Sequence, residues 1–82
     1  MPVVLRIGGY KFWFYESDLG EPQHVHVGKD GIEAKFWLKP IKIAHAGKFR
    51  QVDLRQIERI IGENQMYLMN VWEKELNKHG NS

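Results

Sequence analysis

Hydrophobic and polar residues alternate along the first half of the chain, which is typical of β-strands that bury one face. Gly8-Gly9 can supply the positive φ values of a tight hairpin turn, and Lys29-Asp30-Gly31 predicts a second hairpin. The segment from Ser17 to Pro22 is rich in turn formers and predicts a loop. The pattern therefore predicts five strands, at Val3 to Ile7, Tyr10 to Glu16, Gln23 to Gly28, Ile32 to Leu38 and Ile41 to Ala46.

The period of the hydrophobic residues changes near Asp53. From there, apolar residues recur at helical spacing until Gly80, which predicts one long helix over residues 53–79 with Asp53 as its N-cap. Asn64 interrupts the apolar row, and we expect its amide to cap a carbonyl of a neighbouring strand or loop, because an unpaired buried amide would cost about 1–3 kcal/mol.

A chain of 82 residues is long enough for one domain and too short for two independent cores. We therefore predict a single α+β domain over residues 1–82. Its twisted antiparallel sheet of about five strands (residues 3–46) would be covered on one face by the long C-terminal helix.

The predicted alternation separates an apolar face of the sheet from a face that mixes basic and aromatic side chains. The apolar face, which would pack against the helix, holds Val3, Leu5, Ile7, Phe12, Phe14, Val25, Val27, Ala34, Phe36, Leu38, Ile41 and Ile43. The other face, called the open face below, carries Arg6, Lys11, Trp13, Tyr15, His24, His26, Lys35, Trp37 and Lys42, with Glu33 as its main acidic member. A β-bulge would reverse this parity for the residues that follow it within a strand.

The composition narrows the class of protein. The chain has no cysteine, which excludes disulfides and thiolate metal sites and favours a reducing, cytoplasmic location. The N-terminus lacks the apolar run of a signal peptide and no segment is long enough to span a bilayer, so we expect no membrane partner. A net charge of +2 is too small to indicate nucleic-acid binding by itself. The small size makes a homodimer contact plausible.

His24 and His26 form the most function-like segment. Two residues apart on a strand, their side chains would project from the same face about 7 Å apart. A metal site would need further ligands from Asp18, Glu21, Glu33 or His45, and no complete spacing signature is present, so we predict no metal and no cofactor.

The same pair could perform acid–base chemistry without a metal, because histidine can take and give a proton near neutral pH. In RNA cleavage by the 2′-hydroxyl, His24 and His26 would act as general base and general acid, in either order. Lys35 would then stabilise the phosphorane. The alternative is a structural pair of histidines satisfied by neighbouring polar groups.

The aromatic residues Trp13, Tyr15 and Trp37 lie beside Lys11, Lys35 and Lys42 on the open face. Aromatic rings that stack bases, together with lysines that contact phosphates, are typical of proteins that bind single-stranded RNA. Tryptophan and tyrosine ringed by charge are also typical of protein interfaces. Both interpretations remain open from the sequence.

Three segments resemble the small bacterial proteins of the domain of unknown function 4160 family: Glu21-Pro22-Gln23-His24-Val25-His26-Val27, Ala34-Lys35-Phe36-Trp37-Leu38, and Asp53-Leu54 with Ile57, Ile60-Ile61, Glu63-Asn64, Leu68 and Trp72. The resemblance covers nearly the whole chain and implies a small prokaryotic cytoplasmic protein. Members are often suspected to belong to toxin–antitoxin pairs, which implies a small antitoxin-like partner protein. The family supplies no active site to carry over.

The sequence thus leads to two main functional hypotheses, and a metal-binding protein ranks third because its remaining ligands cannot be named from the sequence. The first is a toxin–antitoxin component, with a metal-independent endoribonuclease that uses His24, His26 and Lys35 as its toxin version. The second is a non-catalytic module that binds a protein or a nucleic acid on the open face.

Overall fold

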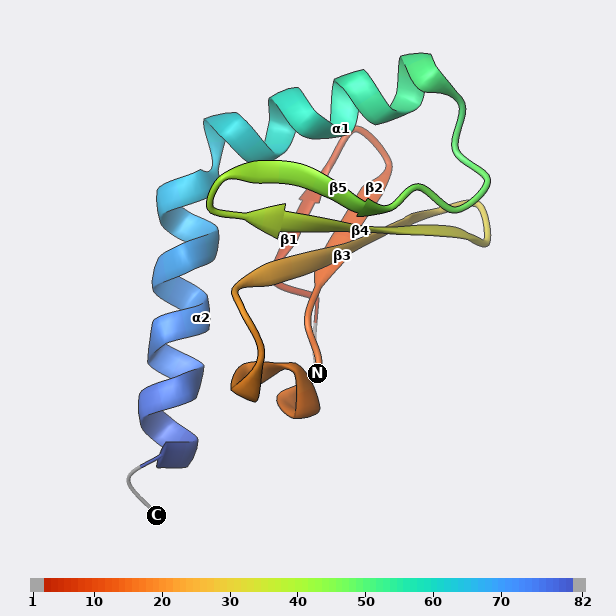
Figure 1. Cartoon of the computed structure of the whole chain (residues 1–82). Helices are drawn as coiled ribbons and strands as arrows, with labels where there is room; N and C mark the ends of the chain where they lie inside the picture. The colour runs from red at the N-terminus through yellow and green to blue at the C-terminus, as the bar shows by residue number, and fades with distance from the viewer. Residues whose placement is uncertain (1–2, 81–82) are drawn as a thin grey trace.

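The computed structural model describes residues 3–80, in which a five-stranded antiparallel sheet has a helix on one side, a short helical turn on the other and a second long helix beside it (Figure 1). The strands follow one another in sheet order as in sequence. Their bounds are β1 Leu5–Ile7, β2 Tyr10–Trp13, β3 His24–Lys29, β4 Ile32–Leu38 and β5 Ile41–His45. The helices are the short 3₁₀ helix η1 at Glu16–Gly20, α1 at Gln51–Glu63 and α2 at Gln65–Gly80.

The strand register places the predicted open-face residues side by side. Trp13 lies opposite His26, and His26 lies opposite Lys35. Since residues that face each other across paired strands project from the same face of a sheet, this register agrees with the predicted alternation in β2, β3 and β4. A bulge between Lys35 and Phe36 shifts the pairing with β5, so that Lys35 lies opposite His45 while Trp37 lies opposite Lys42.

The apolar face of the sheet packs against α1. Phe12, Val25, Val27, Ala34 and Phe36 are buried there with Leu54, Ile57 and Ile61 of the helix. Of the other residues predicted for this face, Val3, Leu5 and Ile41 are half-buried, whereas Ile7 is 37% exposed and Ile43 is 44% exposed. Both lie on outer strands, β1 and β5, which have a neighbouring strand on one side only.

The predicted single helix is wrong, because the structure has two helices separated at Asn64. Asn64 leaves the helical conformation (φ −123°, ψ 15°), and its side-chain amide donates a hydrogen bond of 2.8 Å to the carbonyl of Ile60. The expected bond to a strand or loop carbonyl is therefore replaced by one to the preceding helix. This bond satisfies a carbonyl at the end of α1, while the Leu68 amide donates to Asn64 as α2 begins.

The predicted N-cap is also displaced. The first helix begins at Gln51 with Arg50 as its N-cap residue, and Asp53 lies inside the first turn. Its carboxylate accepts hydrogen bonds of 3.3 Å from the Tyr10 hydroxyl in the sheet and from Nε of the cap residue Arg50. It therefore does not cap the helix amides.

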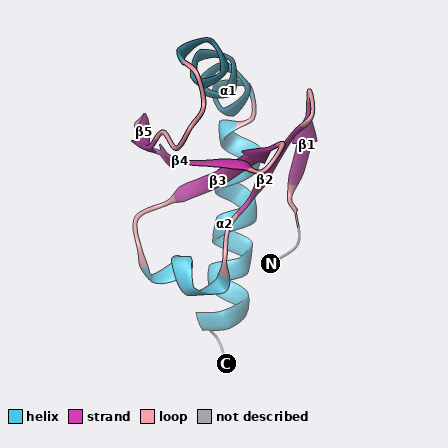
Figure 2. Ribbon diagram, turned by 90° about the vertical axis from the view of Figure 1, so that its right-hand side faces the viewer, coloured by secondary structure: helices cyan, strands magenta, loops and turns pink. Residues whose placement is uncertain are grey.

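The second helix turns away from α1 and runs along the side of the sheet towards η1 (Figures 1 and 2). Trp72 of this helix is buried against Phe14, with ring centroids 5.1 Å apart. Gln65 donates to the Leu38 carbonyl at 2.6 Å, which fixes the start of α2 to the end of β4. None of the described helices is long and apolar enough to cross a membrane.

Most of the segment predicted as a loop belongs to η1, which begins one residue earlier at Glu16, and the second strand ends at Trp13 instead of Glu16. Asp18 explains the change, because its backbone amide donates to the Tyr15 carbonyl at 2.9 Å while its carboxylate accepts the Tyr15 amide at 2.8 Å. These two bonds close a helical turn where the strand would otherwise continue. The turn lies on the side of the sheet opposite α1 (Figure 1).

Gly47 is required where the chain passes from β5 to α1. Its φ is +61°, and a Cβ atom there would lie 1.9 Å from the carbonyl oxygen of Glu33.

We therefore expect Gly47→Ala to lower the free energy of unfolding by more than about 2 kcal/mol, measured by urea denaturation. Gly20→Ala is the matched control, because a Cβ at Gly20 meets no atom within 4 Å. Equal stability of the two variants would contradict this account of the turn.

Candidate functional site

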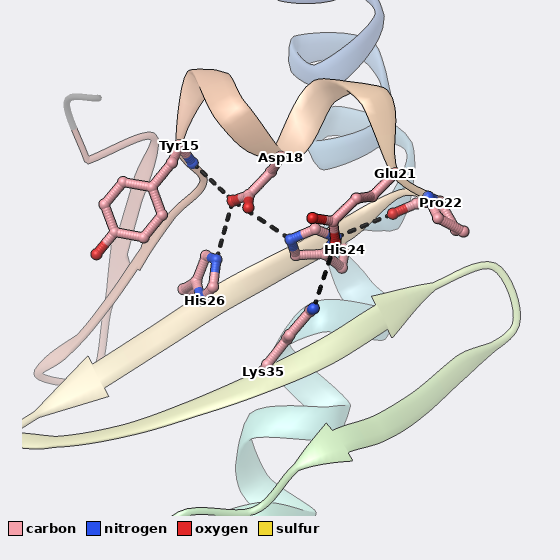
Figure 3. A network of polar contacts seen from close by, with 7 residues as sticks. All are labelled: Tyr15, Asp18, Glu21, Pro22, His24, His26 and Lys35. Carbon is pink, nitrogen blue, oxygen red and sulfur yellow. Dashed lines mark hydrogen bonds and ion pairs between the residues drawn. The ribbon is translucent and has the colours of Figure 1, made fainter.

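Asp18 brings the two histidines together beneath η1 (Figure 3). Its Oδ2 atom accepts the Tyr15 amide at 2.8 Å, lies 2.9 Å from His26 Nε2, and lies 3.3 Å from His24 Nε2. The carboxylate comes from η1, whereas both imidazoles come from β3. The three side chains are called the Asp-His-His cluster below.

His24 is fully buried, and its orientation is fixed by one hydrogen bond. Its Nδ1 atom lies 2.9 Å from the carbonyl oxygen of Pro22. Because a carbonyl oxygen can only accept, Nδ1 carries the proton in this bond. Nε2 then faces the carboxylate of Asp18, but among the described residues it has no hydrogen-bond partner. The rings of Trp37 and Trp72 approach the imidazole edge-on, at 5.7 and 5.2 Å.

His26 is more accessible, with 17% of its side chain exposed. Trp13 stacks on its ring at 5.9 Å with an interplanar angle of 20°, and the ring of Tyr15 meets it edge-on at 5.0 Å. Trp13 in turn lies flat over Gly28, where an added Cβ would come within 2.8 Å of the indole. The two aromatic rings and the glycine therefore hold the imidazole in place beside Asp18.

The carboxyl group of Asp18 is held in its ionised form. Burial raises the pKa of this group, but the hydrogen bonds from the Tyr15 amide and His26 and the proximity of both imidazoles outweigh it. The pKa accordingly lies below the ordinary value of 3.8. A negative charge at this position is therefore a stable property of the cluster.

Lys35 is paired within the fold. Its Nζ atom lies 3.6 Å from Glu21 Oε1 and 4.9 Å from the centre of the Trp37 ring. The carboxylate of Glu21 therefore partly neutralises the positive charge that Lys35 presents to a ligand.

The remaining predicted binding residues lie at two places on the open face. Trp37 and Lys42 line a hollow of about 220 Å³ together with Pro22, Gln23, Lys39 and Pro40. Lys11 and Trp13 line a second hollow of about 320 Å³ beside the turn between β3 and β4. Tyr15 is 44% exposed next to His26. The predicted site is thus one cluster with a hollow on either side of it.

Sequence reasoning named Asp18 only as one of four further ligands, and it gave Trp72 no role at the site. No short sequence motif links either residue to the histidines. Of the four candidate ligands, the fold brings Asp18 to the histidines. Glu21 pairs with Lys35, Glu33 lies opposite Gly28, and His45 lies on the outer strand.

A family model described as Domain of unknown function (DUF4160) matches residues 9–73. The chain belongs to this family. The matched region contains the whole Asp-His-His cluster, both hollows and Trp72. No curated protein and no solved structure matched the chain. The family description names no activity, so the function has to be argued from the site itself.

The lowered pKa of Asp18 predicts how stability depends on pH. A group whose pKa is lower in the folded state adds stability above its unfolded pKa, and this stability is lost as the pH falls through the folded pKa. We therefore expect the stability advantage of the wild type over Asp18→Asn to be largest well above pH 3.8 and to shrink as the pH falls below it. Urea denaturation across this range measures it. Asp30→Asn, in the turn between β3 and β4, is the control; a wild-type advantage over Asp18→Asn that does not vary with pH would contradict the assignment.

Proposed function

We propose that the protein binds single-stranded RNA on its open face, as the toxin member of a toxin–antitoxin pair. The observation that carries RNA binding is the hollow of about 220 Å³ against Trp37, with Lys39 and Lys42 among its lining residues. An aromatic ring can stack a base, and adjacent lysines can contact the phosphates on either side of it. The hollow offers both contacts within one base-sized surface.

The walls of this hollow favour a flat, partly apolar ligand. Pro22 and Pro40 are exposed and provide rigid apolar surfaces near the half-buried ring of Trp37. The Gln23 amide nitrogen donates to Glu73 at 2.6 Å, which leaves the side-chain oxygen of Gln23 to accept a hydrogen bond from the edge of a base. A nucleobase combines a flat face with polar edges, so its chemistry corresponds to that of the lining.

Lys11 and Tyr15 extend the same surface beyond the histidines. Both side chains are exposed, and Lys11 lies on the strand next to His26. A bound strand of RNA that stacks on Trp37 and continues over β3 would pass Tyr15 and reach Lys11. The Asp-His-His cluster would then lie under the middle of the strand.

The toxin role is supported by the resemblance to proteins suspected in toxin–antitoxin pairs, and RNA is a target that such a surface can hold. A small partner protein that covers the open face would block RNA binding. The two partners predicted from the sequence, an antitoxin-like protein and RNA, would then compete for one surface.

RNA cleavage is the second candidate activity, and the 2.9 Å contact between Asp18 and His26 favours it. A carboxylate that orients an imidazole is a common arrangement for acid–base chemistry. Metal-independent cleavage by two histidines also needs His24 at the substrate. His24 is fully buried, however, so it can act on RNA only through Asp18 or His26.

RNA binding can be tested with substitutions on the open face. Trp37→Ala should weaken binding of a short single-stranded RNA by about 1–3 kcal/mol, roughly 5- to 150-fold, because the stacked base loses its platform. Lys42→Ala should reduce the slope of log K against log salt by about 0.7, since one phosphate contact is lost. Filter binding at several salt concentrations measures both quantities.

Arg59→Ala is the matched control for this test, because it removes one exposed positive charge from α1, on the other side of the sheet. It should leave both the affinity and the salt slope unchanged. An equal loss in Arg59→Ala and Lys42→Ala would mean that binding is non-specific, and the assignment of the open face would then be wrong. Circular dichroism of each variant verifies that the fold is retained.

Cleavage and toxicity have a separate test. If the protein is a ribonuclease toxin that works without a metal, its expression should slow growth, EDTA should not protect RNA, and His26→Ala should relieve the inhibition. His45→Ala, which leaves the cluster intact, should remain inhibitory. Growth inhibition that persists in both His24→Ala and His26→Ala would eliminate the histidine mechanism while leaving RNA binding to be judged by its own assay.

A further inference from the structure

The Asp-His-His cluster has the composition of a metal site. Within the described residues, one ligand atom from each of Asp18, His24 and His26 lies within 4.8 Å of the other two. We infer that the cluster binds a divalent first-row transition ion, of which Zn²⁺ is the representative. The inference rests on the geometry of the cluster and does not depend on RNA binding by the open face. It is an alternative to metal-independent cleavage by the histidines, because a ring nitrogen that binds a metal cannot also transfer a proton.

The unpartnered nitrogen of His24 is the observation that points to a ligand. Nδ1 donates to the Pro22 carbonyl, so in the neutral form of the imidazole the lone pair lies on Nε2. That atom is fully buried and, within the part of the chain that the structure describes, accepts no hydrogen bond. A lone pair that faces a carboxylate is unfavourable unless a proton or a metal ion lies between them, and a shared proton would require the alignment of a hydrogen bond, which this pair lacks. Histidines that bind metals commonly donate their other ring proton to a backbone carbonyl in this way.

The contact between Asp18 and His24 also has the geometry of two ligands rather than of a hydrogen bond. The two atoms are 3.3 Å apart, yet the pair is not aligned as a hydrogen bond. Zinc lies about 2.0–2.1 Å from nitrogen and oxygen donors, so neighbouring ligands of a tetrahedral ion are about 3.3 Å apart. Asp18 and His26 are 2.9 Å apart and form a hydrogen bond, and the two histidine nitrogens lie within 4.8 Å of each other, so an ion would have to draw the imidazoles closer together.

The donor atoms select the class of metal ion. Two imidazoles and one carboxylate suit zinc, iron, nickel and related ions, whereas magnesium and calcium prefer sites made entirely of oxygen atoms. Three protein ligands leave a further coordination position open, as in catalytic zinc sites. His26 is the most exposed member of the cluster, so solvent or a substrate would reach this position from the side of His26 and Tyr15.

The surroundings of the cluster limit how far its members can move. The rings of Trp37 and Trp72 enclose His24, and Trp13 and Tyr15 hold His26 on two sides. Asp18 is fixed by the Tyr15 amide. Ligands that are already oriented bind a metal with a smaller loss of conformational entropy.

Calorimetric titration of the full chain without a histidine tag, after treatment with EDTA and buffer exchange, tests the inference. We expect one Zn²⁺ per chain, a higher melting temperature with Zn²⁺, and no comparable effect of Mg²⁺ or Ca²⁺. In nitrogen NMR spectra, the Nε2 signals of His24 and His26 should shift on addition of Zn²⁺ while those of His45 remain in place. Absence of Zn²⁺ binding by the wild-type protein would overturn the inference.

Variants locate the ion. Asp18→Asn keeps the shape of the side chain, and His26→Phe keeps a ring beside Trp13; each should weaken Zn²⁺ binding at least tenfold. The double variant His45→Ala/His79→Ala removes both histidines outside the cluster and should bind Zn²⁺ as the wild type does. Unchanged affinity in Asp18→Asn and His26→Phe, or loss in the double variant, would place the ion elsewhere and refute the site.

One further variant separates this inference from RNA binding. Lys42→Ala should keep its affinity for Zn²⁺, because Lys42 is exposed and lies outside the cluster. If RNA binding fails in every assay while Zn²⁺ binds to the cluster, the metal site stands without the proposed function. If RNA binds and Zn²⁺ does not, only the metal site is refuted.

Discussion

The interruption of the helix at Asn64 is the constraint on which the arrangement of this protein depends. A continuous helix over residues 51–80 would be about 45 Å long. The longest strand, with seven residues, is only about 23 Å long. Half of such a helix would have no sheet beneath it. Because the chain turns at Asn64, α2 can bury Trp72 against Phe14 and close the side of the sheet beside His24.

The packing of α2 beside His24 also ties the Asp-His-His cluster to the stability of the fold. A buried polar nitrogen without a partner costs about 1–3 kcal/mol, so the environment of His24 has to be stabilised by its neighbours or by a bound ligand. Asp18 connects the turn to the histidines, because its Oδ2 atom accepts the Tyr15 amide that closes η1 and also lies next to both imidazoles. The order of η1 and the geometry of the histidines therefore change together. Substitutions at Asp18 will affect local structure as well as chemistry.

The sequence was a good guide wherever a short-range period decides the outcome. The alternation of side chains placed Trp13, His26 and Lys35 on one face, and the strand register agrees with this placement. The helical period continues across Asn64, so a change of direction at one residue leaves little trace in the pattern. The position of Asp18 over the histidines depends on how η1 coils, which no spacing within the sequence predicts. For the same reason, the approach of Trp72 to His24 could be seen only in three dimensions.

All three tryptophans of the chain lie against the histidine pair. Trp13 stacks on His26, while Trp37 and Trp72 approach His24 from two sides. Indole emission is quenched by a nearby imidazolium or a bound open-shell metal ion, so the intrinsic fluorescence of this protein should be dominated by the state of the two rings. The packing that encloses the cluster thereby gives the protein a built-in optical reporter of what occupies it.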